Sequence, residues 1–168
     1  MKTYSVLVSL ILLVFIFACE DVKPDLEKEK QALLKLHEDQ REFHFSKNAK
    51  AFVAQLAPDF ISVNRGKITQ PSEKENIEQF QSYFDYVEFK KWDDVNPPQI
   101  RFSDDGKMAY MIVDKMVEIT YPSDDGQLIQ DNTHFGWVTI CRKQANGEWK
   151  IECVASTNEP ETTKYIPQ

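Results

Sequence analysis

The stretch Thr133-His-Phe-Gly-Trp-Val-Thr-Ile-Cys-Arg-Lys-Gln-Ala-Asn-Gly-Glu-Trp-Lys-Ile-Glu-Cys-Val-Ala-Ser-Thr157 predicts a long β-hairpin. Its Asn146-Gly147 dipeptide favours a two-residue type I′ turn, because both central residues of that turn need positive φ. The register that follows pairs Gln144–Trp149, Lys143–Lys150, Arg142–Ile151, Cys141–Glu152, Ile140–Cys153, Thr139–Val154 and Val138–Ala155.

The period of two along a strand divides this hairpin into two faces. We expect the core face to carry Gly136, Val138, Ile140, Trp149, Ile151, Cys153 and Ala155. The opposite face is mixed and carries Phe135, Trp137, Thr139, Cys141, Lys143, Lys150, Glu152, Val154 and Ser156. Cys141 and Cys153 then point to opposite faces, so we expect two free thiols rather than a disulfide. An apolar hairpin face needs a cover, which the rest of the chain must supply.

The N-terminal segment predicts export. Lys2 precedes an apolar run over residues 6–17, which is too short to span a bilayer comfortably and is typical of a signal peptide. The run ends at Ile16-Phe17-Ala18-Cys19, which resembles a bacterial lipobox, although Phe17 is larger than the usual residue. We therefore expect a signal peptide over residues 1–18, a lipidated Cys19 and an acidic tether over residues 19–26. The alternative is an ordinary cleaved signal with a coincidental cysteine.

Length and charge limit the possible partners. Removal of residues 1–18 leaves 150 of the 168 residues, enough for one domain with a proper core. It also removes Lys2, so 19 of the 20 basic residues remain against 27 acidic ones, a net charge of −8. This balance argues against nucleic-acid binding and against electrostatic attraction to anionic lipids. We expect a location in the cell envelope of a Gram-negative bacterium, periplasmic or on the outer surface, with membrane attachment through the lipid alone.

Helical patterns come first in the chain and strand patterns dominate after them. Helices are expected over residues 26–46, 46–56 and 72–83, the last with a capping box formed by Ser72 and Glu75. Strands are expected over residues 60–63, 86–95, 99–103 and 108–121 and from Asp131 onward, with a break at Pro97-Pro98. This order predicts an α+β fold, with three N-terminal helices packed on a strongly curved antiparallel sheet.

Several phrases in this order resemble the nuclear transport factor 2-like superfamily, which includes SnoaL-like and ketosteroid-isomerase-like proteins. They are Leu56-Ala-Pro-Asp-Phe-Ile-Ser-Val63 with Gly66, Ile100-Arg-Phe-Ser-Asp-Asp-Gly-Lys-Met-Ala-Tyr110, Gly136-Trp137, Asn146-Gly-Glu-Trp-Lys-Ile151 and Ala155-Ser-Thr157. The resemblance covers residues 27–158, leaves a C-terminal tail over residues 159–168, and implies a cone-shaped, cystatin-like α+β roll. A lipocalin-like barrel is the alternative, but three helices before most strands argue against it.

The resemblance implies a pocket between the first helix and the concave face of the sheet. His37, Gln40 and His44 interrupt the apolar stripe of that helix, and a histidine near its ordinary pKa can act as acid, base or donor. We expect these three to line the pocket together with Asn64 and Trp92. The histidines could instead be solvated at the rim or satisfied in the core. No metal site is expected, because no cysteine or carboxylate completes a ligand set on this stripe.

Ketosteroid-isomerase-like proteins place a carboxylate base just before the glycine turn that follows the first strand. Asn64 and Arg65 stand there in this chain, which argues against isomerase-type proton abstraction. Asp114 and Glu118 lie opposite the apolar face of residues 108–121 and are expected to be solvated or to face a dimer partner. No phosphate loop, calcium loop or nucleophile motif is present, so no cofactor is expected.

Two functions remain open on the sequence. The first is the binding of a small molecule in the pocket, with enzymatic activity undecided. The second is a non-catalytic interaction module that uses the exposed sheet face, most simply to form a homodimer. A closed cavity joining the predicted residues would favour the first function, and a cavity filled by side chains would favour the second.

Overall fold

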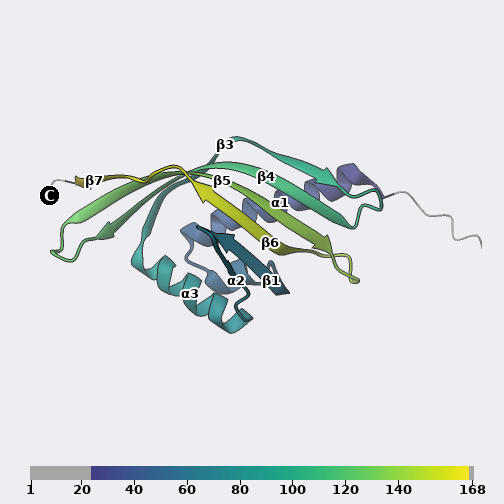
Figure 1. Ribbon diagram of the computed structural model, residues 1–168, viewed down its shortest axis with the longest axis horizontal. Coiled ribbons are helices and arrows are strands. Elements are labelled where there is room, and N and C mark those ends of the chain that lie inside the picture. The colour runs from purple at the N-terminus through teal and green to yellow at the C-terminus, as the bar shows by residue number, and fades with distance from the viewer. Residues whose placement is uncertain (1–23, 167–168) are drawn as a thin grey trace, which may run out of the picture.

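The computed structural model describes residues 24–166, which form an α+β domain as predicted (Figure 1). Its helices are α1 (Leu26–Phe45), α2 (Ala49–Val53) and α3 (Glu73–Tyr86). Its strands are β1 (Leu56–Asn64), β2 (Lys67–Thr69), β3 (Glu88–Phe102), β4 (Met108–Pro122), β5 (Leu128–Lys143), β6 (Trp149–Asn158) and β7 (Thr162–Ile166). The expected signal peptide and the lipidated Cys19 lie outside the described residues. Within residues 24–166, no helix has both the length and the apolar character needed to cross a bilayer.

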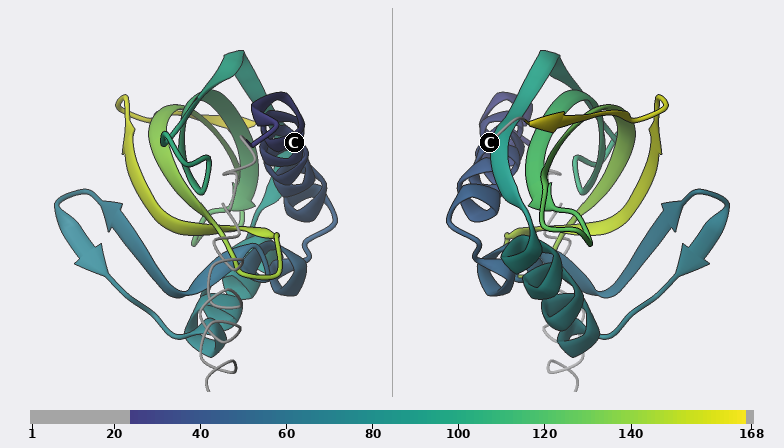
Figure 2. Two further views of the ribbon diagram at one scale, coloured as in Figure 1. Left: turned by 90° about the vertical axis from the view of Figure 1, so that its right-hand side faces the viewer. Right: turned by 90° about the vertical axis from the view of Figure 1, so that its left-hand side faces the viewer.

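The strands form one sheet with the order β2-β1-β6-β5-β4-β3, and β7 pairs separately with β5. Viewed along its length, the sheet is strongly curved, and α1 lies beside it (Figure 2). All pairs are antiparallel except β1 and β6, which run parallel. The expectation of a purely antiparallel sheet is therefore wrong at this one pair, in which β1 and β6 are separated in the chain by β2, α3, β3, β4 and β5.

The helices begin where their capping residues predict. Asp25 accepts a hydrogen bond from the backbone of Lys28 at the start of α1, and Ser72 and Glu75 form the predicted capping box of α3. The second helix is shorter than expected, because Asn48 rather than Ser46 is its N-cap and the chain enters β1 at Leu56. The third continues three residues beyond the predicted end, to Tyr86.

The helices do not form a single layer on the sheet. Strands β1 and β2 precede α3 in the chain, and α3 packs mainly against α2. The ring of Phe52 on α2 lies 4.6 Å from that of Phe80 and 6.2 Å from that of Phe84, both on α3. The expected arrangement of three N-terminal helices on the sheet is thus met clearly only by α1, and α2 with α3 closes one end of the fold.

Strand β3 continues through Pro97-Pro98, where a break was predicted. Proline cannot donate to a sheet ladder, but β3 is an edge strand, so one side of its backbone needs no partner. The register with β4 shifts on both sides of Asn96, and these irregularities accommodate the two prolines.

The hairpin between β5 and β6 forms, but with a different turn. Only Gly147 has positive φ, at 88°, whereas Asn146 does not lie in that region. The backbone N–H of Gly147 donates to the carbonyl of Gln144 at 2.9 Å, and that of Gln144 donates to Glu148 at 2.7 Å. These bonds define a three-residue loop with glycine in the left-handed position, not a type I′ turn.

The predicted register holds from Val138–Ala155 to Ile140–Cys153 and fails nearer the turn, where Cys141 pairs with Ile151. Glu152 is the extra residue of a β-bulge, and a bulge reverses the faces of the strand beyond it. Trp149 and Ile151 are therefore buried as expected, but their inward-facing partners belong to the face predicted to be mixed. Gly136, Val138, Ile140, Cys153 and Ala155 lie on the convex face, which corrects the predicted core. Cys141 and Cys153 are both free.

Two apolar clusters hold the domain together. The larger lies between α1 and the sheet and includes Leu33, Met111, Val113, Cys141 and Ile151. The smaller lies at the α3 end and includes Phe84, Val87, Phe89, Trp92 and Val117. The candidate site lies where the two clusters meet.

Candidate functional site

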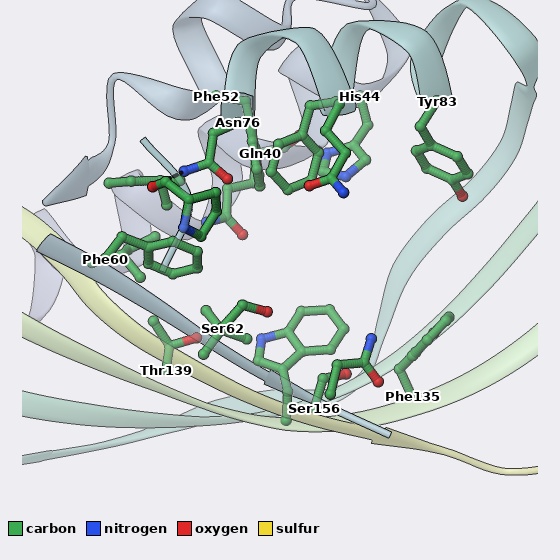
Figure 3. A pocket seen from close by; sticks show the side chains of 18 of the residues that line it. Gln40, His44, Phe52, Phe60, Ser62, Asn76, Tyr83, Phe135, Thr139 and Ser156 are labelled. Carbon is green, nitrogen blue, oxygen red and sulfur yellow. Dashed lines mark hydrogen bonds between the residues drawn. The ribbon is translucent and has the colours of Figure 1, made fainter. Parts of the chain in front are cut away.

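An open cavity of about 370 Å³ lies between the helices and the concave face of the sheet. Helix residues form one wall and strand residues form the opposite one (Figure 3). Much of the lining is aromatic and includes Phe52, Phe60, Phe80, Phe89, Trp92 and Trp137. Polar groups are distributed between these rings. Cavities of this size and composition are typical of sites for small organic molecules.

Four of the five predicted pocket residues line this cavity. Gln40 and His44 project from α1, Asn64 ends β1, and Trp92 projects from β3. His37, one turn before Gln40, does not line it. Its Nε2 lies 3.0 Å from both carboxylate oxygens of Asp94, which places its ring in a separate buried cluster.

His44 is held in one orientation by its surroundings. Its Nδ1–H donates to the backbone carbonyl of Gln40 at 2.6 Å. The imidazole stacks on Trp92 with 4.6 Å between ring centroids. It makes edge-to-face contacts with Phe52 and Phe89, whose ring centroids lie 5.2 and 5.1 Å from its own. Burial lowers the pKa of His44 to about 4, because the charged form would lose its hydration among these rings. His44 is therefore neutral at pH 7.

Behind Trp92, a charged cluster is buried in the fold. Lys115 interrupts the apolar face of β4 and is only 2% exposed. Its Nζ lies 2.6 Å from Asp94, 3.3 Å from Nε2 of His37 and 3.7 Å from the centroid of the Trp92 ring. Burial is the main cause that lowers the pKa of both Lys115 and His37. Nδ1 of His37 is buried without a hydrogen-bond partner within the described part of the chain.

Sequence reasoning missed most of the polar lining. Ser62, Thr139 and Ser156 project from the strands, and Asn76 from α3. For Ser62 the signal was its alternation with Phe60 along β1. Thr139 and Ser156 were missed because the predicted hairpin faces placed them on the mixed face, away from the expected core. Asn76 is buried and donates to the backbone carbonyl of Pro71 at 3.4 Å, which no local pattern predicts.

The other acidic candidates lie away from the cavity. Asp114 is on the convex face, where His134 lies 2.5 Å from it and Asn96 donates to it at 2.6 Å. Glu118 does not line the cavity either, and Arg65 forms the β1–β2 turn with φ of 49°. Among residues 24–166, no group of three or more His, Cys, Asp and Glu side chains is arranged to hold a metal ion.

No family model and no curated protein matches the sequence. Solved structures do match. A candidate scytalone dehydratase from Novosphingobium aromaticivorans aligns with a TM-score of 0.65 at 9% identity, over 83% of this chain and 89% of that one. An uncharacterized protein with a cystatin-like fold from Caulobacter vibrioides aligns with a TM-score of 0.60 at 15% identity, over 79% and 92%.

A candidate ketosteroid isomerase from Shewanella frigidimarina also aligns, with a TM-score of 0.54 at 16% identity, over 73% of this chain and 92% of that one. At such low identity these similarities define the fold and not the activity. The chain has the cone fold of nuclear transport factor 2-like proteins, which confirms the resemblance drawn from its sequence.

Proposed function

We propose that the chain is a lipid-anchored protein of the cell envelope whose cone-fold domain binds a small molecule in the cavity between α1, α3 and the sheet. The observation that carries this proposal is the open cavity itself. The polar side chains of Gln40, Ser62 and Ser156 line it between the aromatic rings. Groups of this kind around aromatic walls are what fixes the orientation of a bound ligand.

A matched pair of substitutions tests ligand binding. Ser156 faces the cavity, and Thr157, its neighbour on β6, faces away from it. Ser156→Trp should fill part of the cavity and abolish the thermal stabilisation that a binding compound gives, whereas Thr157→Trp should leave that stabilisation unchanged. A screen of small molecules by thermal shift on the wild type and both variants measures this. Equal stabilisation of all three proteins would contradict binding in this cavity.

The lipid anchor is proposed from the sequence pattern at residues 16–19. After processing, no other segment is expected to be apolar enough to hold the protein on a membrane. Cys19→Ser should therefore move the protein from the membrane fraction to the soluble fraction. Cys153→Ser is the control for loss of a thiol and should leave the protein in the membrane fraction. A processed Cys19→Ser protein that stays with the membrane would refute the anchor.

A second candidate function is self-association through the convex sheet face. Tyr110, Ile112 and Val138 on this face are 45%, 43% and 37% exposed, and Ile140 lies beside them across β4 and β5. The patch is flanked by His134 and Asp114, which pair with each other, and a two-fold axis through the patch would bring the same apolar side chains of two copies together. A homodimer would cover this apolar surface.

The oligomeric state tests this second candidate. Ile112→Asp places a charge in the middle of the patch and should convert a dimer to a monomer in sedimentation velocity. Ile68→Asp is the matched control, because Ile68 is 75% exposed on β2 and lies outside the patch. A wild type that is monomeric at high concentration would remove the dimer from consideration and leave the cavity as the functional feature.

A further inference from the structure

The cavity wall contains no full charge. No Asp, Glu, Lys or Arg side chain lines it among residues 24–166, and its polar groups are amides, hydroxyls, the indole N–H groups of two tryptophans and one imidazole. A charged ligand would lose its hydration on entering and would find no counter-ion, so its affinity for the cavity would be lowered. An uncharged ligand meets no such penalty.

The nearest buried charges are not available to a ligand. Lys115 lies against the ring of Trp92 but does not line the cavity, and its ammonium is already paired with Asp94 at 2.6 Å. The second contact of Asp94 is with His37, also outside the cavity. The charged cluster is thus closed on itself and leaves the cavity electrically neutral.

Within this neutral cavity, His44 supplies a fixed hydrogen-bond acceptor. A carbonyl oxygen can only accept, so the bond from Nδ1 of His44 to the carbonyl of Gln40 places the proton on Nδ1. The neutral ring then carries a lone pair at Nε2, which has no protein partner within the described residues. An acceptor held in place among aromatic rings selects a ligand that can donate to it.

The shape of the lining defines the rest of the ligand. Rings line the cavity from both walls, with Phe52 on the helix side and Phe135 on the strand side (Figure 3). Flat ring systems pack on such walls by stacked or edge-on contacts. We infer that the cavity selects an uncharged, ring-bearing small molecule that donates an N–H or O–H group to Nε2 of His44. This inference rests on the proposed ligand-binding function and specifies its ligand class.

Four related probes separate the parts of this inference. Indole is neutral and has one N–H donor, 1-methylindole has the same rings without the donor, indole-3-carboxylate is an anion, and tryptamine is a cation. Binding is measured at pH 7 by calorimetry on the full chain in lipid nanodiscs, with empty nanodiscs subtracted. Indole should bind on the order of 5- to 10-fold more tightly than 1-methylindole. The charged probes should bind more weakly than either.

A substitution at His44 assigns the donor effect to Nε2. His44→Phe keeps a ring among the aromatic walls and removes the acceptor, so it should lower the affinity for indole to that for 1-methylindole and leave 1-methylindole unchanged. His134→Phe, on the convex face, is the control and should change neither. If His44→Phe does not fold, the comparison of indole with 1-methylindole on the wild type still decides the donor requirement.

The outcomes distinguish the two levels of the proposal. Equal affinities for indole and 1-methylindole, or tighter binding of a charged probe, would overturn the ligand class while small-molecule binding stands. Absence of binding by all four probes would overturn the ligand class, and the thermal-shift comparison of Ser156→Trp with Thr157→Trp would then decide whether the cavity binds any small molecule.

Discussion

At the scale of single residues, the candidate site depends on polar side chains that interrupt apolar patterns. Gln40 and His44 could be identified from the sequence because they break the apolar stripe of α1. His37 breaks the same stripe but belongs to another cluster, since its partners Asp94 and Lys115 come from strands whose positions the sequence does not reveal. Distant pairings of this kind depend on tertiary register, which no local pattern encodes.

His44 should make the stability of the fold depend on pH. Burial lowers its pKa from the ordinary value of 6.5 to about 4 in the folded state. The unfolded chain therefore binds the proton first, so this contribution to stability is complete above pH 6.5 and is lost as the pH falls toward 4. The loss is at most about 3 kcal/mol. Denaturant unfolding of the wild type between pH 7 and pH 4 measures it.

Two substitutions provide controls of opposite sign for this pH dependence. His44→Phe should flatten the loss of stability between pH 6.5 and pH 4. Asp114 raises the pKa of His134 by hydrogen bonding, so His134 stabilises the fold at low pH and loses this effect as the pH rises. His134→Phe should therefore steepen the acid loss. A His44→Phe profile identical to that of the wild type would show that His44 is solvated.

The buried pair of Lys115 and Asp94 should respond unequally to single substitutions. Asp94→Asn leaves the ammonium of Lys115, which is 2% exposed, without its counter-ion and should cost on the order of 3 kcal/mol. Lys115→Met replaces the ammonium by an apolar group and leaves Asp94 partly solvated, so it should cost less. The double variant should be more stable than Asp94→Asn alone. Urea unfolding of the three proteins measures these differences, and additive losses would contradict the pairing.

At the scale of elements, the hairpin shows what sequence patterns can and cannot predict. The two strands are encoded by their alternation, and their distant register agrees with the prediction only because the bulge at Glu152 offsets the three-residue turn. The faces were predicted wrongly because one bulged residue, Glu152, shifts the period of two, and no residue type marks a bulge reliably. The double proline was predicted to break the strand, yet β3 runs through it. Proline is tolerated there because β3 is an edge strand, and an edge position depends on the whole sheet and cannot be predicted from local sequence.

The turn glycine should be a determinant of folding stability. Gly147 has φ of 88°, so Gly147→Val forces a β-branched side chain into a strained backbone region and should cost on the order of 1–3 kcal/mol. Gly136→Val is the matched control, because Gly136 lies within β5, has no positive φ and has open space around its Cβ position. Melting temperatures measure both variants. Equal effects at the two glycines would contradict the turn geometry.

At the scale of the whole molecule, a curved sheet and a helix along it leave a space that the core does not fill. The α+β class and the cone fold could be predicted from the order of elements and from the family phrases. The resemblance also implied a pocket between α1 and the concave face, but whether that pocket is open or filled could not be predicted, because its volume depends on how α2 and α3 close one end of the sheet. That closure is also what separates a binding domain from a filled interaction module.

The most direct test of the central claim is a crystal structure of the protein soaked with indole. We predict electron density for indole inside the cavity, between His44 on α1 and the strand residues Thr139 and Ser156, with its N–H directed at Nε2 of His44. A cavity closed by side chains, or indole found only on the convex face of the sheet, would contradict the account.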